Sequence, residues 1–231
     1  MTWKACFEQH GSAGNLLAGL LILAAAGVSP NIFVAAQAGV ADMKDMGLWL
    51  LLPSIVILLT ALLFAWIRDY TRLVNRVVAG AAAGVIATVG LEVVRMYSFH
   101  HGGMPGDLPR LMGVLLTDRF MLGPSPLSDT LGYAYHYWNG AAFGIVFAVV
   151  LGRKAIYWGV VYGVIIATVF LLSPPVQALG IGLMGSEMPT MPVTVYIAHL
   201  AYGGILGWFC HRWIRDEGWL LACLGFRQER V

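Results

Sequence analysis

Six stretches of this sequence are apolar over a length close to that of a bilayer crossing, and they constrain the fold more than any other feature. An α-helix needs about 20 mainly apolar residues to span a bilayer. We therefore expect an all-α, polytopic membrane helix bundle that forms a single domain over residues 1–231. Its transmembrane helices, about six in number, are predicted at 14–37, 47–67, 77–97, 131–151, 155–173 and 193–211.

The composition agrees with a membrane protein and argues against a nucleic-acid-binding one. Hydrophobic residues make up 59% of the chain and charged residues 11%, whereas soluble domains contain about 25% charged residues. The net charge of +2 comes from basic residues spread along the chain, with no basic run and no phosphate-binding glycine loop. The expected partner is the lipid bilayer, and no nucleic acid.

Basic residues indicate which way the helices run, because cytoplasmic loops of membrane proteins are enriched in lysine and arginine. Ten of the fourteen fall in segments that would share one side of the membrane. This distribution predicts that both termini are cytoplasmic, with an outer loop at 98–130 and a cytoplasmic tail at 214–231. The ten residues are Lys4, Arg68, Arg72, Arg76, Arg153, Lys154, Arg212, Arg215, Arg227 and Arg230.

Two parts of the chain repeat the same features in the same order. The sequence GVIATV at 84–89 is echoed by GVIIATV at 163–169, and HYWNGAAFG from His136 is echoed by HLAYGGILG from His199. Since each copy contains two helices, we expect a parallel internal repeat. Residues 77–154 form the first unit and 155–213 the second, while the two helices within 1–76 stand outside the repeat.

The glycines of the echoed segment favour close packing of helices. Gly140 with Gly144, and Gly203 with Gly207, have the four-residue spacing that lets helix backbones approach one another. We predict that these two pairs form the seam where the two units meet.

Ionisable residues inside the predicted spans form the candidate site. A charge within a bilayer costs about 3 kcal/mol or more on insertion scales, which makes such residues functional candidates. Glu92, His136 and His199 would lie at similar depth near the outer face, with His100 and His101 just above them. The alternatives are structural, namely a salt bridge from Glu92 to the residue at i+3 and a hydrogen bond from each histidine to a neighbouring helix.

Imidazole and carboxylate groups together suit a transition metal. Iron, copper or zinc could be held by the metal-ligand candidates Glu92, His136, His199, His100 and His101. Alternatively, two histidines on facing helices could ligate the iron of haem b. Arg95 and Asn139 are expected to support the ligands from the second layer.

Three motifs carry a resemblance to known proteins: GVIATVGLEVVRM, MPGDLPRLMG and HYWNGAAFG. They resemble small multi-pass bacterial inner-membrane proteins of uncharacterised families, which share a Gly-x-x-Ala-Thr helix and a His-x-x-x-Gly-x-x-x-Gly helix. The resemblance covers residues 80–150, with a fainter second match over 160–210. It implies residence in the bacterial inner membrane and no particular activity.

Three functions fit these features. The first is a redox or metal-handling module with its His/Glu site near the periplasmic face. The second is a non-catalytic accessory subunit of a larger respiratory or oxygenase complex, which would have other membrane subunits or further copies of itself as partners. The third is a small-solute or proton-coupled transporter, since parallel repeats and buried titratable groups occur in such proteins.

Overall fold

The computed structural model describes residues 13–218 and 220, and within them the chain forms helices and no strands. Five helices are long and apolar enough to cross a membrane, which supports a multi-pass membrane protein. They are α1 (Ala13–Gln37), the continuous helix Met43–Ile67, α4 (Thr71–His100), α6 (Pro126–Leu151) and α9 (Thr190–Trp213). The sixth predicted span is the shorter α7 (Tyr157–Leu172), whose 16 residues measure about 24 Å at 1.5 Å per residue.

The second long helix contains three parts. It begins as α2 (Met43–Met46), passes through a π-helical stretch η2 (Gly47–Leu51) and continues as α3 (Leu52–Ile67). Three shorter elements lie in the connections: α5 (Leu108–Leu116), α8 (Pro174–Ala178) and the 3-10 turn η3 (Leu183–Gly185). The predicted outer loop at 98–130 contains α5, which packs on α6.

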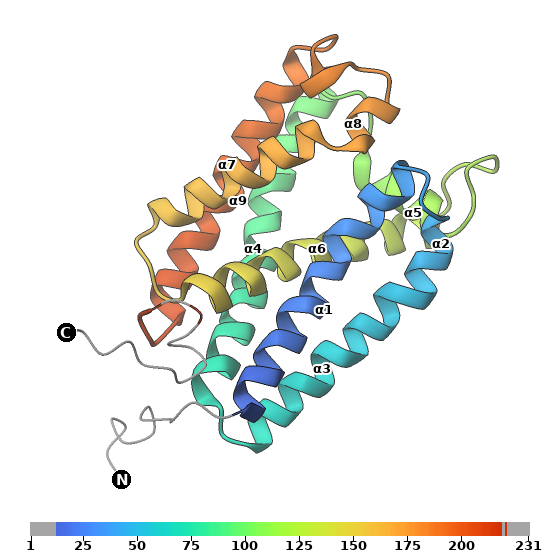
Figure 1. Cartoon of the computed structure of the whole chain (residues 1–231). Helices are drawn as coiled ribbons and strands as arrows, with labels where there is room; N and C mark the ends of the chain where they lie inside the picture. Colours follow the sequence, from blue (N-terminus) through green and yellow to red (C-terminus); the bar gives the residue numbers. More distant parts are fainter. Residues whose placement is uncertain (1–12, 219, 221–231) are drawn as a thin grey trace.

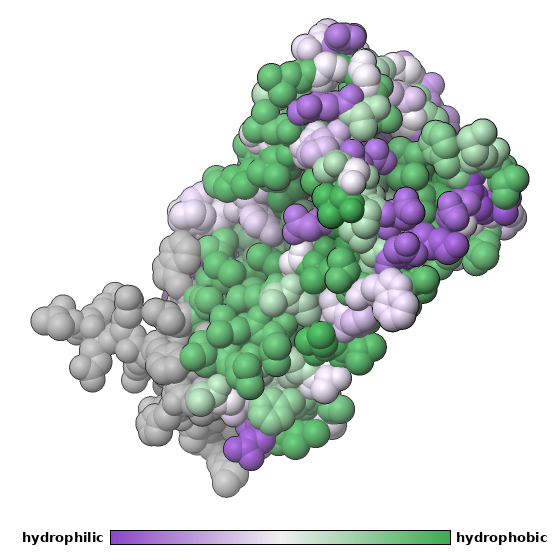
Figure 2. Space-filling model, turned by 45° about the vertical axis from the view of Figure 1, so that its right-hand side comes forward, coloured by the Kyte–Doolittle hydropathy of each residue, from purple (hydrophilic) through white to green (hydrophobic). Residues whose placement is uncertain are grey.

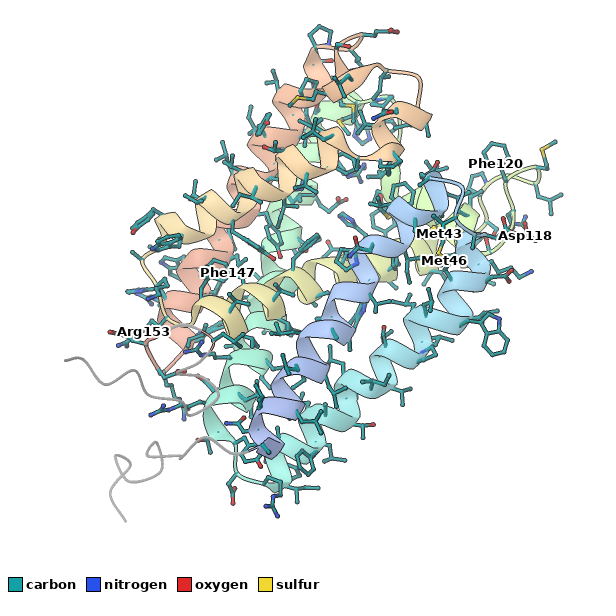
Figure 3. The ribbon with its side chains drawn as sticks, viewed as in Figure 1. Met43, Met46, Asp118, Phe120, Phe147 and Arg153 are labelled. Carbon is teal, nitrogen blue, oxygen red and sulfur yellow. The ribbon has the colours of Figure 1, made fainter. Side chains whose placement is uncertain are left out.

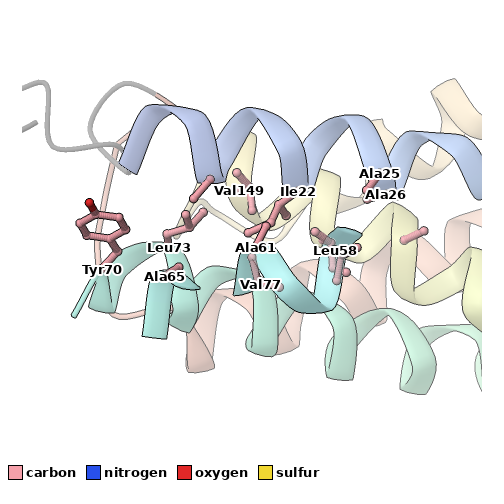
Figure 4. Packing of buried hydrophobic residues seen from close by; sticks show 13 residues of the cluster. Ile22, Ala25, Ala26, Leu58, Ala61, Ala65, Tyr70, Leu73, Val77 and Val149 are labelled. Carbon is pink, nitrogen blue, oxygen red and sulfur yellow. The ribbon is translucent and has the colours of Figure 1, made fainter. Parts of the chain in front are cut away.

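Figure 1 shows α4 and α6 in the centre of the bundle, with α1 and α3 on one side and α7 and α9 on the other. α1 packs on α3 and α6, whereas α9 packs on both α4 and α7. Buried side chains from α1, α3, α4 and α6 form one apolar cluster at the end of the bundle where α4 begins (Figure 4). The labelled members include Ile22, Leu58, Ala65, Leu73 and Val149.

The outer surface is strongly apolar, as expected where lipid replaces water. Figure 2 shows a broad hydrophobic area in the lower half of the view, with hydrophilic residues gathered above it. Large apolar side chains point outward from several spans: Trp49 is 76% exposed and Val93 is 66% exposed. In a membrane these side chains face the lipid chains.

The packing glycines lie at helix contacts, but with partners other than those predicted. A Cβ atom on Gly144 would clash with Gly80, and one on Gly140 would clash with Thr88, both in α4. Gly203 is equally close to Gly159 of α7. The predicted seam between the two units is therefore wrong, because each glycine pair holds together the two helices of its own unit.

The second hairpin completes the same pattern. Gly207 also approaches Gly159, and Gly163 lies against the carbonyl group of His199. Each unit thus has a Gly-x-x-x-Gly face on both of its helices, Gly80 with Gly84 on α4 and Gly159 with Gly163 on α7. Small residues at this spacing let the backbones touch.

A buried arginine attaches the start of the predicted tail to the bundle. The side chain of Arg76 is fully buried; its Nη2 donates to Oδ2 of Asp216 at 2.5 Å and its Nε to Oδ1 at 3.2 Å. Its Nη1 donates to the carbonyl group of Val149 at 2.9 Å, and Ile214 is buried nearby. Residues 214–218, the start of the predicted tail, are therefore packed on the bundle. Arg227 and Arg230 lie outside the described residues, as does Lys4.

Candidate functional site

Glu92 and Arg95 form a buried ion pair on one face of α4. They are three residues apart, a spacing that brings side chains together on a helix. Arg95 Nε donates to Glu92 Oε1 and Arg95 Nη2 donates to Glu92 Oε2, both at 2.7 Å. Only 7% of Glu92 and 4% of Arg95 is exposed. The pair has the parallel, two-bond geometry that is the strongest arrangement of these groups.

A second carboxylate reaches the same guanidinium group from the connection before α5. Oδ1 of Asp107 lies 3.1 Å from Nη2 of Arg95, and the hydroxyl group of Tyr133 on α6 donates to Oδ2 of Asp107 at 3.0 Å. Asp107 also occupies the N-cap position of α5, where its side chain makes no capping hydrogen bond. The sequence motif GDLPR signals a helix start, but it gives no indication that Asp107 reaches Arg95.

His136 joins this cluster from α6. Its Nε2 atom lies 2.9 Å from Oε1 of Glu92, and 13% of its side chain is exposed. The two side chains therefore make a polar contact between α4 and α6. Glu92 now has both oxygens next to cationic or N–H groups.

Asn139 lies one turn further along α6 and bonds to α1 rather than to the cluster. The hydroxyl group of Ser29 donates to Oδ1 of Asn139 at 2.5 Å. Tyr135 donates to the carbonyl group of Ser29 at 2.6 Å. These bonds hold α1 against α6 beside the cluster.

His199 occupies the corresponding position on α9. Its Nδ1 atom lies 2.8 Å from the carbonyl oxygen of Val195, and its ring is stacked with that of Phe170 at a centroid distance of 6.5 Å. Since a carbonyl oxygen only accepts, Nδ1 carries the proton and Nε2 of the neutral ring presents a lone pair.

The structure places His100 and His101 apart from these groups. Both are exposed at the end of α4, where their Nδ1 atoms lie 2.7 Å from the carbonyl oxygens of Met96 and Tyr97. Within the part of the chain that the structure describes, no three His, Cys, Asp or Glu side chains come together in a group that could hold a metal ion.

A cavity of about 380 Å³ connects the two histidines. His136, Arg95 and His199 all contribute to its wall. Residues of α1, α4, α6 and α7 line this cavity. Figure 3, in the view of Figure 1, shows the side chains in the region between α1 and α7. The remaining wall is largely apolar and comes from α1, α4, α5, α6, α7 and α9; it includes Val34, Leu91, Met112, Phe143, Ile166, Val169, Phe170 and Ala198.

Further polar residues lie in this wall. Thr88 and Thr194 line it, and so does Tyr202, whose hydroxyl group donates to the carbonyl group of Gly140 at 2.7 Å. The site therefore combines a mainly apolar volume with a few polar groups, which is the usual make-up of a small-molecule pocket. Apart from the histidines, Arg95 and Asn139, none of these residues was predicted, because the sequence does not show which helix faces close on one another.

Comparisons of the chain with protein-family models, with curated proteins and with solved structures found no match. The functional argument therefore rests on the geometry of the cavity.

Proposed function

We propose that the protein is a small-solute transporter whose substrate binds, within the membrane, in the 380 Å³ cavity. The observation that carries this proposal is the position of the cavity between the two glycine-packed hairpins. α4 and α6 contribute Arg95 and His136, and α7 and α9 contribute Phe170 and His199. Transporters built from repeats commonly bind their substrate at the interface of the repeats.

The proposal includes a parallel internal repeat and six crossings. Its support is that α4 with α6, and α7 with α9, make contact through glycines at equivalent positions of the echoed sequences. α7 would then be the sixth crossing, shorter than the others. Two similar hairpins beside one cavity provide the two bodies that alternating access requires.

We also propose a bacterial inner-membrane location with cytoplasmic termini. Several of the basic residues on which the orientation depends lie at one end of the bundle. Arg76 binds Asp216, the backbone N–H of Arg153 donates to the carbonyl group of Asp216, and His211 approaches the carbonyl group of Lys154. Such clustering is typical of the cytoplasmic side.

The proposed function is tested by identifying small molecules that co-purify with the protein. Val169 lines the cavity from α7 and is 62% exposed, so that Val169→Trp should fill the entrance without disturbing the core. Val164→Trp, on the same helix but outside the cavity lining, is the matched control. Mass spectrometry of detergent extracts should find a small molecule with the wild-type protein and Val164→Trp and lose it with Val169→Trp. Equal content in all three proteins would refute the proposal.

A transition metal or haem is the second candidate, favoured by one observation. His136 and His199 line the same cavity, and the neutral ring of His199 has a lone pair at Nε2. Against it, Glu92 already binds Arg95 through both oxygens. Elemental analysis and an absorption spectrum of the purified protein test this candidate; a metal that disappears in the double variant His136→Ala/His199→Ala would support it over the transporter. The accessory-subunit function stays a prediction.

A further inference from the structure

The chemical class of the solute follows from the hydrogen bonds and charges around Arg95, and this step rests on the proposed function. Of the three guanidinium nitrogens, Nε and Nη2 bind Glu92 and Asp107. The third, Nη1, is buried and has no hydrogen-bond partner among the residues that the structure describes. Arg95 is 4% exposed and lines the cavity. A buried N–H group without a partner is costly, and an oxygen atom of a ligand would satisfy it.

The charge of the cluster does not favour an anion at this position. The single positive charge of Arg95 faces two carboxylates, Glu92 and Asp107, which leaves a net charge of minus one when His136 is neutral. Protonation of His136 would bring the cluster only to zero. An arginine that binds an anionic ligand needs its positive charge free for that ligand. Here that charge is already neutralised within the protein.

His199, which lines the same cavity from α9, offers an acceptor. Nδ1 of His199 donates to the carbonyl group of Val195, which leaves Nε2 of the neutral ring able to accept a hydrogen bond from a hydroxyl group. The cavity lining is otherwise mainly apolar, and its aromatic rings include those of Phe143, Tyr162 and Phe170. The cavity therefore offers a donor, an acceptor and an apolar volume.

We propose that the solute is an uncharged molecule with an apolar body and a carbonyl or hydroxyl group at its polar end, and that carboxylates are rejected. The carbonyl oxygen accepts from Nη1 of Arg95, or the hydroxyl group donates to Nε2 of His199. A carboxylate of the same length would be repelled by Glu92 and Asp107. The positive charge of Arg95 would not offset this repulsion, because the two carboxylates already neutralise it. Uncharged, lipid-soluble carbonyl compounds and their alcohols are the class that fits.

The test compares three probes that have the same number of carbon atoms, namely 2-decanone, 2-decanol and decanoate. The measurements are made at pH 8, where decanoate is ionised. Saturation-transfer NMR measures their binding to the full-length protein in lipid nanodiscs, and Val169→Trp nanodiscs correct for partitioning into lipid. We expect the ketone and the alcohol to bind the wild-type protein at least about tenfold more tightly than decanoate, a ratio that corresponds to about 1.4 kcal/mol.

The outcomes separate the two proposals. Decanoate binding as tightly as the ketone, with loss in Val169→Trp, would overturn the uncharged-solute inference and leave the binding function standing. Binding of all three probes that is identical for wild type and Val169→Trp would overturn both.

A second variant tests the charge argument directly. Asp107→Asn keeps an acceptor for Tyr133 but removes one carboxylate from Arg95. We expect the affinity for decanoate to rise about tenfold, the order of effect that one nearby charge exerts in a partly buried site, while that for 2-decanone changes less than about twofold. Asp129→Asn is the control, because Asp129 pairs with Arg110 outside the cavity lining. An unchanged preference in Asp107→Asn would overturn the inference, since a purely structural role of Asp107 would not alter selectivity.

Discussion

Nε2 of His136 lies 2.9 Å from Oε1 of Glu92, and the contact joins α6 to α4 at the carboxylate that already holds Arg95. Glu92 thus binds a partner on its own helix and one on the next. A carboxylate in this position neutralises Arg95 and also fixes the side chain of His136 at the cavity wall.

Glu92→Gln should lower the free energy of unfolding by about 3–5 kcal/mol, because breaking a buried ion pair leaves the partner charge without compensation. Arg95 would keep only Asp107 as a carboxylate partner. Reversible unfolding in mixed detergent micelles measures the change. Asp45→Asn, at an exposed position in α2, should change the free energy by less than about 0.5 kcal/mol. Similar stability of the two variants would contradict the assignment of Glu92 to a buried pair.

Neighbouring glycines in α9 provide a matched test of the hairpin contact. Gly203→Ala should destabilise the protein by about 1–3 kcal/mol, because the added methyl group would overlap the backbone at Gly159. Gly204→Ala should be neutral or stabilising by up to about 1 kcal/mol, since alanine favours helix over glycine and this position has open space. The change in the free energy of unfolding should therefore differ between the two variants in sign or clearly in size. Equal changes would argue against the α7–α9 contact.

Arg76→Met should loosen residues 214–218 from the bundle. Asp216 would lose its buried partner, and the carbonyl group of Val149 would lose its hydrogen bond. We expect a loss of about 3–5 kcal/mol in the free energy of unfolding and faster amide hydrogen exchange in 214–218, measured by mass spectrometry. Arg110→Met is the control, because its ion pair with Asp129 is half exposed and such pairs contribute about 0–1 kcal/mol. Unchanged exchange in Arg76→Met would refute the anchoring role.

Ser29→Ala should weaken the contact between α1 and α6. The change removes the hydroxyl group that donates to Asn139 and leaves that buried amide oxygen unsatisfied, which costs about 1–3 kcal/mol. Thr130→Val, which removes an exposed hydroxyl group bonded within its own helix, should cost less than about 0.5 kcal/mol. Thermal unfolding of both variants checks the difference, and a Ser29→Ala protein as stable as Thr130→Val would show that this bond does not hold α1.

Much of the helical architecture could be predicted from the sequence, because a span is recognised from local composition. The apolar segments at 14–37 and 193–211 correspond to helices Ala13–Gln37 and Thr190–Trp213. The pairing of Glu92 with Arg95 also follows from local spacing. Each of these features depends on residues close together in the chain.

The contacts between helices could not be predicted in the same way. Gly140 was expected to face the other unit, but it packs on Thr88 of its own unit. Arg76 was interpreted only as a positive charge at the membrane surface, whereas the structure buries it completely. Asp107 is 12 residues from Arg95 along the chain, and its approach depends on how the connection folds over α4. Such contacts depend on how the helices pack in three dimensions, and the sequence pattern of a helix does not show which neighbouring helix it packs against.

All the members of the Arg95 cluster come from α4, from the residue just before α5 and from α6. The cluster is thus encoded entirely within residues 71–151, before the chain of α7 begins. During synthesis, Glu92, Arg95 and Asp107 can compensate one another as soon as the first hairpin leaves the ribosome. These charges can therefore be paired before α7 and α9, which contribute the other part of the cavity wall, have been synthesised.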